Sequence, residues 1–129
     1  MEFPAELWKS DEELTAVRQV VDLFSASPLF LTDSLTNTVY FSPMAEELLG
    51  EQGEAIVNRA ACSLLGFGRG TPVPPALNAA LLGEGPAWKA LVRLENGCSV
   101  ACEASAIRGP NGLICGMVRL FEPVESGGR

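Results

Sequence analysis

The four cysteines are the side chains of this sequence best suited to chemistry. They are Cys62, Cys98, Cys102 and Cys115, in a chain that has no histidine. No two of them form a C-x-x-C pair, so a zinc site would need all four thiolates or acidic partners at unusual spacing. If Cys98 and Cys102 share a strand, their Cα atoms lie roughly 13 Å apart, which is too far for a disulfide. We therefore expect four reduced, mostly buried thiols and no metal site.

Without histidine, neither a Ser/His/Asp triad nor a Cys/His pair can form. No two acidic residues stand in a recognisable catalytic setting, and the pattern described below places Glu103 on an outward face of a sheet. We therefore expect the protein not to be an enzyme.

Composition narrows the class of protein further. The chain has 129 residues, 47% of them hydrophobic and 19% charged, which is typical of one globular domain. Its net charge of −7 repels phosphate backbones and anionic lipid, so we expect no binding to nucleic acid or to a membrane surface. The sequence has no signal-peptide pattern at Met1 and no apolar run approaching the ~18 residues that span a bilayer. These features predict a cytoplasmic location.

An amphipathic helix is predicted over residues 10–26. Ser10 can cap its start, and a stripe of apolar side chains runs along one side at three- and four-residue steps. The stripe either covers this domain's own sheet or also meets a second copy of the chain. On the second interpretation the helix mediates a homodimer through four candidate residues: Leu14, Val17, Val21 and Phe24.

Two short strands are predicted next, over residues 29–33 and 39–41. The polar residues 33–37 between them form a turn, in which Asn37 tolerates the left-handed conformation. This pattern predicts a β-hairpin.

The hairpin leads directly into a short helix. Ser42 is a good N-cap, Pro43 fits the first helical position, and Gly50 is suited to end the helix. Two further helices are predicted, over residues 54–65 and from Pro74-Pro75 through Leu82.

From Ala87 onward the hydrophobic period changes to two, which predicts the strands 87–94, 98–107 and 113–122. A three-residue loop, 95–97, places Lys89 opposite Glu103, where they can form an ion pair. A two-residue Asn-Gly loop would instead bury two unpaired cations, at a cost of several kcal/mol. For the second hairpin we expect residue 102 to pair with residue 116.

This register produces one wholly apolar sheet face, which the helices of the middle of the chain must cover. Several of its residues are small, so either a helix packs closely there or a void remains that holds a ligand. The residues of this face and of the helix above it that would line such a cavity are Cys62, Trp88, Val100, Cys102, Ile114 and Val118.

The order of these elements resembles the PAS domain. The stretches that carry the resemblance are LFLTDSLTNTVYFSPMAEELLG (29–50), similar to the family's first hairpin and helix, and GCSVACEASAIRGPNGLICGMVRLF (97–121), similar to its last two strands. The resemblance implies an α+β fold, with a five-stranded antiparallel sheet, short helices on one face and an N-terminal amphipathic helix on the other. The expected divisions are an N-terminal helical cap, 1–27, a PAS-like core, 28–122, and a tail, 123–129.

The sequence also departs from this family. Ser42 stands where the family often has Asn, and Glu122-Pro123-Val124 replaces a common Asp-x-Thr signature. No output domain is recognisable, so the chain is either freestanding or a piece of a longer protein.

Members of this family bind two kinds of cofactor, haem and flavin, through residues that can be compared with this sequence. Haem-binding relatives commonly use histidine, which is absent here, although a Cys or Met ligand remains conceivable. Flavin-binding relatives have a reactive cysteine in Asn-Cys-Arg-Phe-Leu-Gln, and Cys62 stands near the corresponding place. Its neighbours, however, are Ala61 and Ser63, and Val100 and Cys102 replace an amide that reads the flavin ring. We therefore predict no cofactor.

The resemblance implies a sensory or protein-interaction module of bacterial signal transduction, in a two-component kinase or a transcription regulator. Such a module could bind a small apolar ligand under its helices, dimerise, and act on an effector or kinase domain in cis or in trans. The alternatives are a ligand-free dimerisation module and a flavin or redox sensor.

Overall fold

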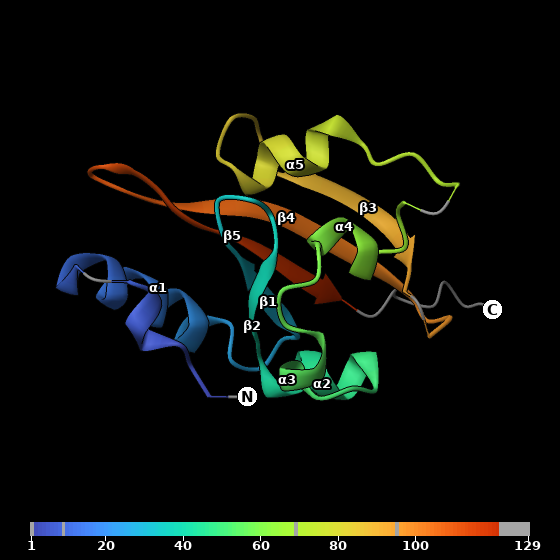
Figure 1. Cartoon of the computed structure of the whole chain (residues 1–129), viewed down its shortest axis with the longest axis horizontal. Helices are drawn as coiled ribbons and strands as arrows, with labels where there is room; N and C mark the ends of the chain where they lie inside the picture. The colour runs from blue at the N-terminus through green and yellow to red at the C-terminus, as the bar shows by residue number, and fades with distance from the viewer. Residues whose placement is uncertain (1, 9, 69, 95, 122–129) are drawn as a thin grey trace.

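Five strands form one antiparallel sheet in the order β2-β1-β5-β4-β3 (Figure 1). The computed structural model describes residues 2–8, 10–68, 70–94 and 96–121. Residue 122 of the last predicted strand, the predicted tail 123–129, Arg69 and Glu95 of the 95–97 loop lie outside the described residues. The strands are β1 (Leu29–Thr32), β2 (Thr38–Phe41), β3 (Trp88–Arg93), β4 (Ser99–Gly109) and β5 (Gly112–Phe121).

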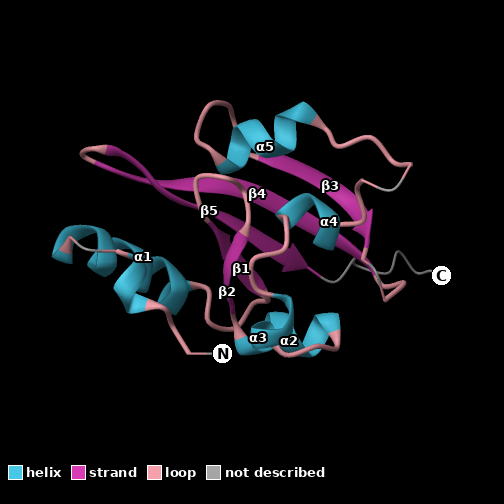
Figure 2. Cartoon of the chain, in the orientation of Figure 1, coloured by secondary structure: helices cyan, strands magenta, loops and turns pink. Residues whose placement is uncertain are grey.

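Helices lie on both sides of this sheet (Figure 2). They are η1 (Ala5–Leu7), α1 (Asp11–Leu23), α2 (Pro43–Leu49), α3 (Gly53–Ile56), α4 (Ala61–Leu64) and α5 (Pro75–Leu81). Residues of α2 to α5 pack in one apolar cluster with the inner face of the sheet, whereas α1 and Trp8 pack in a second cluster with the outer face. The predicted fold class is therefore confirmed.

The start of α1 follows its sequence signals. The Ser10 hydroxyl accepts a hydrogen bond from the Glu13 N–H at 3.5 Å, as expected of a capping residue. The helix ends at Leu23, three residues before the predicted end. Phe24 is its C-cap, and the chain turns there into Ser27-Pro28, where the residue before proline avoids the helical region.

Ser42 joins the first hairpin to α2. Its hydroxyl accepts hydrogen bonds from the Ala45 N–H at 3.2 Å and from the Leu29 N–H at 3.0 Å. One buried side chain thus caps α2 and also satisfies the first donor of β1. The helix continues through Pro43 and ends at Gly50, which has a φ of 75°, as predicted.

Replacing Ser42 with alanine should lower the free energy of unfolding by about 2 kcal/mol, because the substitution removes a cap and leaves a buried N–H without a partner. Urea denaturation measures the change. Ser34→Ala, in the exposed turn of the same hairpin, is the control and should be neutral. Equal effects at the two positions would mean that the hydroxyl of Ser42 does not connect the two elements.

The β1–β2 turn differs from its prediction in one detail. Asp33 Oδ1 accepts from the Leu35 N–H at 2.8 Å and from the Asn37 N–H at 3.0 Å. These bonds place the positive φ, 63°, at Thr36 rather than at Asn37. The prediction for Asn37 was wrong because side-chain bonding to Asp33 sets the turn, and single-residue preferences do not include it.

The single helix predicted over residues 54–65 is interrupted. Asn58 has a φ of 75°, and its N–H donates to the Thr38 carbonyl at 2.8 Å, while the Thr38 N–H donates to the Arg59 carbonyl at 2.9 Å. Residues 58–59 therefore satisfy the edge of β2. The gain from pairing the strand edge outweighs helix continuity, so α3 and α4 are separate turns.

The β3–β4 hairpin has the predicted register. Lys89 pairs with Glu103 across the strands, and Lys89 Nζ lies 3.5 Å from Glu103 Oε2. The Leu94 N–H donates to the Cys98 carbonyl, so the pairing extends to the two residues that flank the predicted loop.

The β4–β5 hairpin has a different register from the predicted one. Cys102 pairs with Leu120 rather than with Gly116, a shift of four residues, because the strands continue to a two-residue turn at Pro110-Asn111. An even shift keeps each residue on its predicted face. A β-bulge next to the turn leaves Ile114 out of the pairing, and Ile114 packs with the outer cluster instead of the predicted inner face.

Candidate functional site

The inner face of the sheet brings together five of the six predicted cavity residues. Val100, Cys102 and Val118 are buried in the inner cluster, and Cys62 of α4 and Trp88 of β3 are partly buried against it. Trp88 also meets Phe67 edge to face, with ring centroids 5.9 Å apart. Ile114, on the other face, is the exception. The sequence pattern thus located the inner face correctly and misplaced the residue beside the bulge.

Large side chains occupy the space that a ligand would need under the helices. Phe30 and Phe41 are fully buried and lie with their ring centroids 5.5 Å apart. Leucines from three helices pack into the same cluster: Leu49, Leu64, Leu77 and Leu81. Burial in this cluster raises the pKa of Cys102 to about 11, so its thiol stays protonated at neutral pH. The inner face is an apolar core, not a reactive centre.

Buried polar atoms that lack a hydrogen-bond partner occur at two places beneath the helices. They are Thr32 Oγ1 on β1 and Asn78 Oδ1 on α5. Thr32 faces Gly116 of β5, at the point where the backbone of Leu81 passes over the sheet. These two atoms are polar groups without a partner next to a largely apolar cluster.

Hollows open on the surface instead, and three of them border the sheet or the β3–β4 loop. One of about 390 Å³ lies between α2 and the β3–β4 loop and is lined by Leu49, Gly50, Glu51, Leu64 and Asn96. One of about 710 Å³ lies between α2 and the ends of β4 and β5; its lining includes Met44, Cys98 and Phe121. The third, also about 390 Å³, lies on the outer sheet face over β3 and β4. Of the six predicted cavity residues, Cys102 is the one that lines any of these three hollows. It borders the third hollow from the inner side of the sheet.

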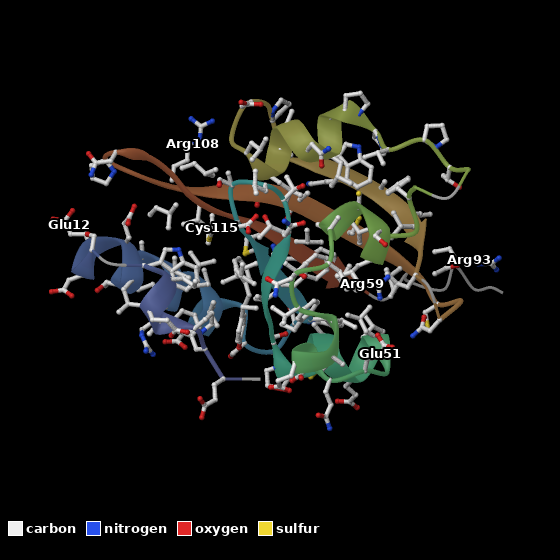
Figure 3. The ribbon with its side chains drawn as sticks, viewed as in Figure 1. Glu12, Glu51, Arg59, Arg93, Arg108 and Cys115 are labelled. Carbon is white, nitrogen blue, oxygen red and sulfur yellow. The ribbon has the colours of Figure 1, made fainter. Side chains whose placement is uncertain are left out.

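The predicted dimer residues all face the chain's own sheet. Leu14, Val17, Val21 and Phe24 belong to the outer cluster, and Val17 is 0% exposed. Cys115 lies beneath α1 in the same cluster (Figure 3), where burial, with a smaller effect of Glu13, raises its pKa to about 12. The apolar stripe of α1 is therefore used within the chain, and Val17 is not available to a second copy.

Arg119 connects the end of α1 to the sheet. Its guanidinium lies 3.8 Å from the ring centroid of Phe24 and 4.7 Å from that of Phe121. Its Nη1 donates to Glu103 Oε1 at 3.3 Å. Arg119 Nε is buried and has no partner. One cation thus links the last turn of α1 with β4 and with the end of β5.

Sequence reasoning missed the aromatic group in front of α1. Trp8 is buried in the outer cluster, Phe3 stacks on it with ring centroids 5.4 Å apart, and Tyr40 meets Phe3 edge to face. Burial, with smaller effects of Glu46 and Asp22, raises the pKa of Tyr40. The available signal was two aromatic residues five positions apart, but no hydrophobic period links them to an element.

Comparisons with known proteins bear on this fold. No family model matches the sequence, and the search of curated proteins found no match. The structure is similar to a LOV protein of Rhodobacter sphaeroides, with a TM-score of 0.64 and 19% identity over 93% of this chain and 72% of that one. It is also similar to the PAS domain of nitrogen regulation protein NR(II) from Vibrio parahaemolyticus, with a TM-score of 0.58 and 15% identity over 89% of this chain and 100% of that one.

A third similar structure is the PAS domain of a Colwellia psychrerythraea protein, with a TM-score of 0.62 and 14% identity over 83% of this chain and 96% of that one. The chain has the PAS fold. The resemblance inferred from the two quoted stretches is thereby confirmed at the level of the fold.

The LOV neighbour raises the question of whether this PAS fold suits a flavin. A flavin ring carries carbonyl and N–H groups along one edge, and a protein site normally fixes such an edge with placed polar groups. On β4 the inward-facing residues are Val100, Cys102 and Ala104, all buried in the apolar cluster. These three residues of β4 therefore offer no amide or hydroxyl group to the edge of a flavin ring.

The described residues contain no group of three His, Cys, Asp or Glu side chains arranged to hold a metal ion. Within the same residues, no helix has the length and apolar character needed to cross a bilayer.

Proposed function

We propose that this PAS-fold domain is a non-enzymatic sensory or protein-interaction module of bacterial signal transduction, in a two-component kinase or a transcription regulator. The observation that carries the proposal is the contact of Arg119 with Phe24, Phe121 and Glu103. The N-terminal helix, the middle of β4 and the last residue of β5 meet at this one side chain. A shift of the sheet relative to α1 would therefore change the contacts of Arg119 with the end of α1 and with the end of β5.

A ligand under the helices belongs to this proposal, and the apolar inner face sets its chemistry. The partly buried Cys62, Phe67 and Trp88 border the inner cluster and could admit a small apolar molecule by changing rotamers. The energy available for signalling is the difference in the ligand's affinity for the two arrangements of the domain.

Mass spectrometry of the undenatured full chain, purified without refolding, tests ligand binding. A sensor of this kind is expected to carry a small molecule at up to one per chain. A mass equal to that of the bare chain, unchanged after incubation with cell extract, would contradict ligand sensing. It would favour the second candidate, a ligand-free dimerisation module, and the filled inner cluster supports the absence of a ligand.

A flavin or redox sensor is the remaining alternative, favoured by the likeness to the LOV protein and by the half-buried Cys62 on α4. An absorbance scan of fresh protein decides it. We expect no band above the aromatic absorbance, because Val100, Cys102 and Ala104 of β4 place no amide against a flavin ring and Phe30 and Phe41 fill the space beside them. A flavin band that bleaches in blue light would overturn this expectation.

A further inference from the structure

The side chain of Asn96 joins the β3–β4 loop to the last turn of α2. Its Nδ2 donates to the Leu48 carbonyl at 2.9 Å, and its Oδ1 accepts from the Cys98 N–H at 3.0 Å. Carbonyls in the last turn of a helix have no partner within the helix, so the first bond satisfies one of them. This pair of hydrogen bonds, here called the Asn96 bridge, therefore holds α2 against the loop that leads into β4.

Each end of the Asn96 bridge borders a hollow. Asn96 lines the hollow of about 390 Å³ between α2 and the β3–β4 loop, together with Leu64. Leu48 lines the hollow of about 710 Å³, together with Leu120. Leu64 and Leu120 are buried members of the inner cluster, and Leu48 packs against it. Both hollows thus end on the apolar layer that lies beneath the helices.

The lining of the two hollows favours an uncharged, apolar molecule. Their volumes lie within the range of roughly 300–1,000 Å³ that small-molecule pockets have. Glu51 (Figure 3) lines the smaller hollow and Glu47 the larger one, and both carboxylates repel an anion. A cation would lose its hydration on entering the inner cluster, whose members are all apolar.

We propose that a small, uncharged apolar molecule enters the inner layer between α2 and the β3–β4 loop, and that the Asn96 bridge holds this route closed. Separating the two segments would break the bond between Asn96 and the Leu48 carbonyl and join the two hollows above Leu64 and Leu120. Asn96 is a positioning residue, because it acts through α2. The inference rests on the proposed sensory function and names the way in for its ligand.

A thiol introduced into the floor of the smaller hollow tests the proposal. In the full chain carrying Leu64→Cys, the rate of modification at position 64 by N-phenylmaleimide, a neutral apolar reagent, is measured by peptide mass spectrometry. Asn96→Asp keeps an oxygen for the Cys98 N–H but has no N–H for the Leu48 carbonyl. We expect it to raise the rate about fivefold, the effect of one lost hydrogen bond. Asn111→Asp, in the exposed turn of the other hairpin, adds the same charge and should not change the rate.

Two further measurements separate this route from unfolding. The rate at position 64 should not depend on urea below the unfolding transition, because a local opening exposes little surface. Compared with the urea-unfolded chain, the folded chain should favour N-phenylmaleimide over the anion iodoacetate by about tenfold or more, because the route excludes a charge. Leu120→Cys, in the larger hollow, provides the same readings where Leu64→Cys does not fold.

The proposal is overturned if Asn96→Asp and Asn111→Asp change the rate equally, if the rate rises steeply with urea, or if the folded chain favours neither reagent more than the unfolded chain does. These outcomes concern entry alone. The mass measurement that tests ligand sensing uses the unaltered chain, so the two proposals can fail separately.

Discussion

Replacing Gly116 with alanine is expected to destabilise the domain by about 3 kcal/mol, as an overpacked core does. A Cβ at this position would overlap Thr32 Oγ1 and would lie 2.8 Å from the backbone carbonyl oxygen of Leu81. Thr32 is fully buried, and a backbone oxygen has no rotamer by which to move away. Helix α5 would have to lift from the sheet, and urea denaturation would record the loss.

Gly85→Ala is the matched control, because its new Cβ would lie 3.5 Å from that of Ala79, an ordinary contact. Thr32→Ala combined with Gly116→Ala should recover part of the loss, since it removes one of the two overlaps, and the two substitutions should be non-additive. A neutral Gly116→Ala would mean that α5 does not rest on β5 as described.

Val17→Asp should have a comparable effect, a loss of at least ~3 kcal/mol, because it places a carboxylate in the apolar cluster between α1 and the sheet. Where this variant does not fold, Val17→Ala still reports on the site, with an expected loss of about 2 kcal/mol. The unfolding midpoint of either variant should not depend on protein concentration.

Leu23→Asp on the same helix is the control for Val17, since Leu23 is exposed and should tolerate the change. The two interpretations of the α1 stripe differ in one result. If the stripe also met a second copy of the chain, the unfolding midpoint of the unaltered protein would rise with protein concentration, and Val17 variants would remove that dependence. Unchanged stability in Val17→Asp would contradict the packing of α1 on its own sheet.

The signals that identified the fold from sequence were local ones. The signals for α2 lie at its two ends, and each acts within one helical turn. Ser42 caps the start, Pro43 lacks an N–H that would have no partner at the first position, and Gly50 adopts the positive φ that ends the helix. The β3–β4 register followed from the cost of burying cations such as Lys89 and Arg93, which exceeds any preference among turn types.

The features that sequence could not predict depend on contacts between distant segments. Asn58 breaks a helical pattern because its backbone satisfies the edge of β2, which no helical period reveals. The bulge at Ile107 and Arg108 moves Ile114 to the outer face, where it packs in a cluster with residues of α1 and β1. The sequence pattern predicted that the side chain of Arg119 points outward. Its contact with Phe24 was not predicted, because that contact forms only when α1 packs on the sheet.

The candidate site also has one part that local sequence signals predicted and one part that depends on contacts between distant segments. The period-two pattern placed Val100, Cys102 and Val118 on one face, as the structure has them. Whether that face encloses a void depends on the side chains that helices bring to it. Phe30 and Phe41 fill the space, and their closeness follows from the pairing of β1 with β2, not from a property of the inner strands.

Helices shield both faces of the sheet, and α1 closes part of the outer one. The rate of thiol alkylation at pH 8, resolved for each cysteine by peptide mass spectrometry, tests this arrangement. Cys98 is exposed and should react first, and Cys62 more slowly. Cys102 and Cys115 should stay unmodified until the protein unfolds, because burial hides both thiols and raises their pKa to about 11 and about 12. Alkylation of Cys115 as fast as that of Cys98 would show that α1 does not cover the sheet, and equally fast alkylation of Cys102 would show an open inner face.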